Sequence, residues 1–276
     1  MVQSSLPMRR FLPFLLCAAI AAALLPAVAS PQGLPALTRL LGLSGQLRAV
    51  FALPGEAADA ATGLEPIRLI ILKPFSAKVR GTIGSYRLGT WPYERSAPPD
   101  PSYRPPRGFI EVTPENFAMR VSEHFTLGEF VTKNQTDVWP KYVALERRLL
   151  DKLELVIAEL QEMGHPVGDL HVMSGFRTPD YNRAGVGEGG RSAVSRHQYG
   201  DAADVFPDKD RNGWTDDLTG DGRVDLKDAR VIAEAAERVE REHPELVGGI
   251  GIYPATRAHG PMVHIDARGK RARWNG

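Results

Sequence analysis

The sequence predicts an α+β fold, because two helical patterns stand among a set of short β-type runs. The first helical pattern covers 141–163, where leucines recur at three- and four-residue steps and Gly164 provides a stop. The second covers 226–242 and gathers Val231, Ile232 and Val239 on one face. The short β-type runs lie at 67–72, 79–88, 170–174, 202–206, 249–253 and 262–266.

The pattern along the chain predicts three parts. Residues 1–29 are typical of a secretory signal peptide, with two arginines before an apolar run that ends Ala-Val-Ala. Residues 30–107 form an N-terminal region with a short β element and an extended linker at 97–106, where five of ten residues are proline. Residues 108–276 carry the remaining elements, and we expect the principal domain there.

Composition and cysteine use narrow the possible functions. The 276 residues are 43% hydrophobic, and 34 Lys+Arg balance 33 Asp+Glu. The chain has no basic excess of the kind that marks a nucleic-acid-binding surface, so we expect it to bind no nucleic acid. We also expect a globular monomer. Cys17 lies inside the signal peptide, so the mature chain has no disulfide. It is expected in the periplasm, the extracellular space or the cell wall, with no permanent membrane span after cleavage.

His197, Asp204 and His264 are candidate metal ligands. Two histidines and one aspartate, with a fourth position left for water, are the ligand set of a catalytic zinc ion. Seven residues span about 10.5 Å on a helix and about 23 Å on a strand, so the chain must reverse between His197 and Asp204, at Tyr199-Gly200. By themselves these residues are a weak signal, because most such histidines are ordinary surface or core residues.

The residues around the candidate ligands resemble a known family. The motif Ser-x-His-x-x-Gly-x-Ala-x-Asp at 195–204 follows Ser-Gly-Phe-Arg-Thr-Pro at 174–179, and the chain closes with further matching blocks at 248–253 and 263–269. Together they resemble the zinc D-alanyl-D-alanine carboxypeptidases and murein endopeptidases, over about residues 108–276. The resemblance implies the fold shared with the hedgehog signalling domain, a small antiparallel sheet with flanking helices.

The resemblance also implies roles for individual residues. His197, Asp204 and His264 would bind Zn²⁺. Arg177 would face the substrate carboxylate or the developing oxyanion, for which a planar, permanently charged guanidinium is suited; the alternative is an ion pair that holds its own turn. Ser195 would support the His197 loop at the substrate-binding site, or serve as a plain turn hydroxyl.

The sequence departs from the family at the general base. Many members carry an acidic residue three positions before the last histidine, and here that position is Pro261. Asp266 is the nearest substitute, two residues along the strand from His264 and therefore on the same face. It would either act catalytically, by accepting the proton of the attacking water, or orient a metal ligand. His259 is a third candidate.

A second cation site is predicted in an insertion at 208–228. A twelve-residue pattern starting at Asp217 places oxygen ligands and a glycine as in a calcium loop, and a helix follows it. The predicted calcium residues are Asp217, Thr219, Asp221, Arg223, Asp225 and Asp228. We expect a structural Ca²⁺; the alternative is an acidic surface loop.

These observations predict an exported zinc metallopeptidase that hydrolyses D-Ala-containing stem peptides or cross-links of peptidoglycan. Whether it acts as a carboxypeptidase or an endopeptidase stays open. One alternative is a catalytically silent module of the same fold that only binds peptidoglycan peptides, and a second is a calcium-dependent interaction protein.

Overall fold

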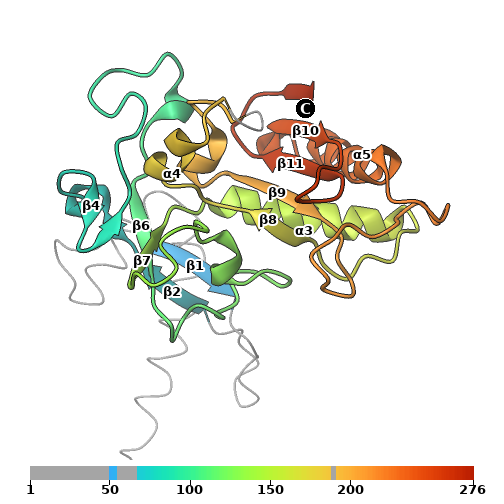
Figure 1. The fold of residues 1–276 in the computed structure, drawn as a ribbon, viewed down its shortest axis with the longest axis horizontal. Helices are drawn as coiled ribbons and strands as arrows, with labels where there is room; N and C mark the ends of the chain where they lie inside the picture. The colour runs from blue at the N-terminus through green and yellow to red at the C-terminus, as the bar shows by residue number, and fades with distance from the viewer. Residues whose placement is uncertain (1–49, 55–66, 188–190) are drawn as a thin grey trace, which may run out of the picture. The chain divides into compact units, whose positions relative to one another are not determined.

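The computed structural model describes residues 50–54, 67–187 and 191–276, which form an α+β protein (Figure 1). These residues belong to one compact unit, Ala49–Gly276. The predicted signal peptide at 1–29 lies outside the described residues. In the part of the chain that the structure describes, no helix is both long and apolar enough to cross a membrane.

A five-stranded sheet forms the centre of the fold, in the order β12-β10-β11-β9-β8. Its strands are β8 (His171–Ser174), β9 (Ala202–Phe206), β10 (Gly249–Tyr253), β11 (Met262–Asp266) and β12 (Ala272–Asn275). All neighbours are antiparallel except β10 and β12, which run parallel. Every residue of β9 and β11 is buried. The bounds predicted for β9, β10 and β11 are confirmed, whereas β12 was not predicted.

Two long helices pack beside this sheet (Figure 1). Helix α5 (Leu226–Glu242) contacts β10 and β11, and α3 (Arg147–Glu162) packs against α5. The predicted bounds of α5 are confirmed. The helix predicted over 141–163 instead begins at Arg147, because β7 (Lys141–Val143) pairs with β6 (Gly108–Val112).

Smaller elements surround the sheet and the helices. A three-stranded sheet has the order β3-β6-β7, with β3 at Lys73–Pro74. Strands β1 (Val50–Pro54) and β2 (Ile67–Ile71) pair with each other, as do β4 (Thr82–Ile83) and β5 (Tyr86–Arg87). The short helices are α4 (Pro179–Ala184) and the 3₁₀ turns η1 (Phe75–Ala77), η2 (Pro101–Tyr103), η3 (Leu127–Phe130), η5 (Arg196–Tyr199) and η6 (Pro244–Leu246). The predicted N-terminal β element is therefore present.

Residues 67–107 belong to the same compact unit as the described residues that follow them. Trp91 is buried, and its Nε1 donates a hydrogen bond of 2.6 Å to the carbonyl oxygen of Gln198. The predicted extended linker contains η2, where the Ser102 carbonyl accepts from Arg196 at 2.9 Å. The segment is therefore not a free linker: the Tyr103 ring also lies 5.6 Å from the Tyr199 ring, centroid to centroid.

Candidate metal centre

His197 reaches the site because the chain reverses immediately after η5. Gly200 has φ +76°, a left-handed conformation that glycine adopts without strain. A Cβ at this position would lie 2.4 Å from the carbonyl oxygen of Ala144, so no larger residue fits. The reversal predicted at Tyr199-Gly200 is confirmed, and it returns the chain into β9 towards Asp204.

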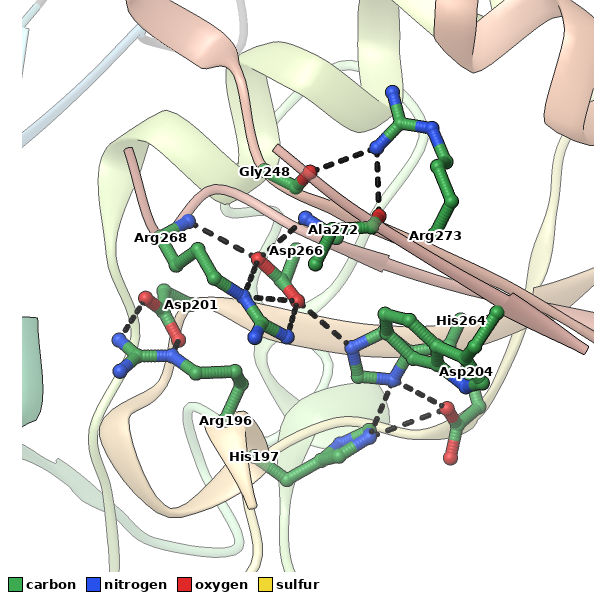
Figure 2. A network of polar contacts seen from close by, with 12 residues as sticks. Arg196, His197, Asp201, Asp204, Gly248, His264, Asp266, Arg268, Ala272 and Arg273 are labelled. Carbon is green, nitrogen blue, oxygen red and sulfur yellow. Dashed lines mark hydrogen bonds and ion pairs between the residues drawn. The ribbon is translucent and has the colours of Figure 1, made fainter. Parts of the chain in front are cut away.

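Strand register brings the other two ligands together. His264 on β11 lies directly opposite Asp204 on β9. The Nδ1 atom of His264 lies 3.0 Å from Oδ1 of Asp204, and Nε2 of His197 lies 3.1 Å from each of these two atoms (Figure 2). All three side chains are buried. Three ligand atoms from η5, β9 and β11 therefore converge on one point.

The partners of the two imidazoles fix which nitrogen faces that point. Nδ1 of His197 lies 2.7 Å from the carbonyl oxygen of Gly175, which can only accept, so Nδ1 carries the proton and Nε2 is left with a lone pair. Nε2 of His264 lies 3.0 Å from Oδ2 of Asp266 and donates to it (Figure 2). When both histidines are neutral, three acceptor atoms face one another, an arrangement that a cation stabilises.

Charge and burial act in opposite directions on these groups. Burial lowers the pKa of His197 to about 4, so this histidine is neutral at pH 7. Burial would raise the pKa of Asp204, but His197, His264 and Arg177 hold it well below its ordinary value. Burial would also lower the pKa of His264, yet Asp204 and Asp266 raise it. When His264 is protonated, the proton on Nδ1 occupies the place that a metal would take.

The distances fit a metal ion. Atoms bound tetrahedrally at about 2.0–2.1 Å lie roughly 3.3 Å apart, close to the separations of 3.0 and 3.1 Å in this group. Among the described residues, only one other group could hold a metal ion, Glu123, His124 and Glu154. In that group His124 donates to Glu154 at 2.5 Å, a hydrogen bond that ties its loop to α3.

Asp266 orients His264 and does not line the cleft above the ligand group. It is fully buried, and its carboxylate accepts from Gly249 N at 2.8 Å, from the Arg268 guanidinium, and from His264 (Figure 2). Of the two roles predicted for Asp266, the geometry favours the orientation of a metal ligand. Pro261 is buried, and its carbonyl accepts from Thr215 Oγ1 at 2.7 Å.

Arg177 contacts one of the three candidate ligands, so its ion pair reaches β9 and is not confined to its own turn. Its guanidinium forms an ion pair with Oδ2 of Asp204, the oxygen that faces away from the two histidines, and its Nε donates to Ser174 Oγ at 2.8 Å. It also lines the cleft. Ser195 stands at the N-terminus of η5, makes no capping hydrogen bond with its side chain, and lines the cleft as well.

A cleft of about 670 Å³ opens over the three ligands. Its aromatic lining consists of Tyr103, Tyr181, Tyr253 and Trp274, and His259 also lines the cleft. Trp274 reaches this wall because Gly251 has no side chain: a Cβ there would lie 2.2 Å from the indole ring. The Trp274 and His264 ring centroids are 5.1 Å apart. Trp274 belongs to the residues that carry the family resemblance, and the parallel pairing of β10 with β12 places it beside the site.

The residues predicted to bind calcium lie on the loop before α5 and in its first turn, but their side-chain oxygens are engaged with backbone amides and with neighbouring side chains. Asp217 accepts from Gly220 N and Gly222 N at 2.8 and 2.7 Å. Asp228 is buried and accepts from the backbone at 218, 219 and 225, while Asp225 caps α5. Thr219 donates to Asp217, and Asp221 pairs with Lys227 and accepts from the Arg223 amide. Among the described residues, neither group that could hold a metal includes this loop.

Comparison with protein-family models and with curated protein sequences gives no match. What can be said of function therefore depends on the geometry of the site.

Proposed function

We propose that this protein is an exported zinc metallopeptidase that hydrolyses peptide bonds in peptidoglycan stem peptides or cross-links. The observation that carries the proposal is the convergence of His197 Nε2, Asp204 Oδ1 and His264 Nδ1 at the floor of a cleft. Two imidazoles and one carboxylate that leave a position open to solvent are typical of catalytic zinc sites. The residues present therefore fit the ion.

The protein supplies a rigid ligand set. Gly175 O fixes the tautomer of His197, Asp266 fixes that of His264, and Arg177 holds the second oxygen of Asp204. When bound there, zinc supplies a Lewis acid that polarises a carbonyl group and lowers the pKa of water. Because every ligand is held by a further group of the protein, little reorganisation accompanies the reaction.

His259 is the residue we assign to proton transfer. Among the described residues that line the cleft, it is the one histidine outside the ligand group. Its Nδ1 donates to Gly260 O at 2.7 Å, which leaves Nε2 as the free acceptor. In this role Nε2 takes the proton of the attacking water and returns it to the leaving amine. Asp266 has its carboxylate fully engaged and keeps the positioning role.

The substrate class follows from the cleft and from the resemblance of the sequence motifs. An open cleft with four aromatic side chains accommodates an extended peptide, and the Arg191 guanidinium, which pairs with no described carboxylate, favours an anionic peptide. Stem peptides of peptidoglycan are short and carry several carboxylates. The predicted signal peptide would deliver the protein to the compartment that contains them.

The test is hydrolysis of purified cross-linked muropeptides by the mature chain, stripped of metal and then reloaded with one equivalent of zinc. We expect products only after reloading, none with His197→Ala, and a strongly reduced kcat with His259→Gln. The matched control is His165→Ala, because His165 lies outside the cleft and bonds to the Leu218 carbonyl. Intact substrate that nevertheless binds would instead identify a silent peptidoglycan-binding module. The engaged state of Asp266 and the proline at 261 give that alternative its physical basis.

A further inference from the structure

A side pocket of about 130 Å³ lies next to the metal cleft. It shares Met173, Arg177, Tyr181 and Arg191 with the cleft, and Lys133 and Phe176 contribute further wall. Because Arg177 lines both cavities and pairs with the ligand Asp204, the side pocket adjoins the centre where bond cleavage is proposed.

The charges in this pocket are unbalanced. Three of its lining residues are cations, and no described lining residue is an aspartate or a glutamate. Arg177 is neutralised by Asp204. Lys133 forms no ion pair with any described residue, and the hydrogen bonds and ring contact that the Arg191 guanidinium makes with described residues all involve the neutral Tyr181. The guanidinium lies 4.7 Å from the Tyr181 ring centroid and donates two long hydrogen bonds of 3.4 Å to its carbonyl and hydroxyl oxygens.

Arg191 differs from the other arginines of the cleft in the groups that hold its guanidinium. Arg177, Arg196 and Arg268 each form an ion pair with a buried aspartate, namely Asp204, Asp201 and Asp266 respectively. Their charges are therefore compensated inside the protein. Arg191 is positioned by an aromatic face instead, which holds the planar group in place without neutralising it. Its remaining N–H groups, which bond to no described residue, stay available to an external anion.

We propose that Lys133 and Arg191 form a carboxylate-binding subsite that recognises a free carboxylate of the bound peptide. This inference rests on the proposed peptidase function and names the feature of the substrate that selects it. Guanidinium groups bind carboxylates through paired, charge-assisted hydrogen bonds, and the Lys133 ammonium adds a second positive charge. The carboxylate is either the C-terminal one or a side-chain one next to the cleaved bond. The small volume admits such a group on a short aliphatic stem.

The test compares matched ligands on the zinc-loaded mature chain. The first pair is diacetyl-L-Lys-D-Ala-D-Ala and its C-terminal amide; the second is a stem tetrapeptide with diaminopimelate or with lysine at its third position. We measure kcat/KM and, by calorimetry, Kd for the wild type, Arg191→Met and Lys133→Met. Methionine keeps much of the apolar stem and removes the charge. The control is Arg183→Met, because Arg183 is exposed and pairs with Asp180.

Arg191→Met is expected to weaken binding and kcat/KM for the carboxylate ligand about tenfold to a hundredfold, with less than a threefold effect on its uncharged partner. The pair that shows this difference identifies the C-terminal or the side-chain carboxylate as the group bound. Equal losses for both members of both pairs, or no loss at all, would overturn the subsite. If no peptide is cleaved, the proposed catalysis fails, whereas the Kd values still decide whether the subsite exists.

Discussion

Replacing Asp266 by asparagine tests whether this carboxylate acts by positioning a metal ligand. The substitution keeps the size of the side chain and removes its charge. Asp266 accepts from His264 Nε2 at 3.0 Å, from Gly249 N at 2.8 Å and from Arg268 Nε at 2.8 Å. An amide has one acceptor oxygen, so its NH₂ group must face at least one of these donors.

The size of the effect follows from this geometry. Loss of the partner that orients a ligating histidine costs about 10–100-fold in metal affinity. A buried donor left without an acceptor destabilises the fold by about 1–3 kcal/mol. Asp266→Asn should therefore bind zinc one to two orders of magnitude more weakly and melt at a lower temperature, even in the metal-free form.

The assay is zinc titration against a competing chelator, together with calorimetric unfolding of metal-free and zinc-loaded protein in calcium-free buffer. Asp228→Asn is the matched control. Asp228 is equally buried, but its carboxylate accepts from backbone amides at 218, 219 and 225 instead of contacting a ligand. It should lose stability and keep its zinc affinity. An Asp266→Asn protein with wild-type zinc affinity, or a control that loses as much, would refute the reasoning.

Three further predictions concern metal binding and the core. Zinc affinity should fall as the pH drops below the raised pKa of His264, because the proton then occupies the ligand nitrogen; pH-independent titrations would contradict this. Lys152→Met should destabilise the fold by about 3 kcal/mol. The buried ammonium of Lys152 donates to the Glu240 carboxylate at 2.6 Å and to the Asp266 carbonyl oxygen, and the substitution leaves both without this donor. Chemical denaturation measures that loss, which Arg273 limits by its own ion pair with Glu240. Adding Ca²⁺ should raise the melting temperature, and Asp217→Asn should abolish the increase; calcium with no thermal effect would leave the loop as a purely hydrogen-bonded turn.

Local patterns in the sequence determined most of the elements. The strands at 202–206, 249–253 and 262–266 and the helix at 226–242 have the predicted bounds, because burial and periodicity are encoded within each segment. The reversal at Gly200 was likewise predictable, since two ligands seven residues apart cannot share an ion on one straight element. The start of α3 was not predictable from the sequence, because Lys141–Val143 form a strand only through their pairing with β6.

The tertiary structure decided how the site is assembled. Only the register of β9 against β11 places His264 opposite Asp204, and no local pattern encodes the partner of a strand. The same holds for Trp274 beside His264 and for the ion pair of Arg177 with Asp204. The sequence alone offered Asp266 two roles, and the three donors around its carboxylate favour one of them. The sequence identified which residues could bind a metal. The groups that hold each of these residues come from distant segments, so only the tertiary structure shows them.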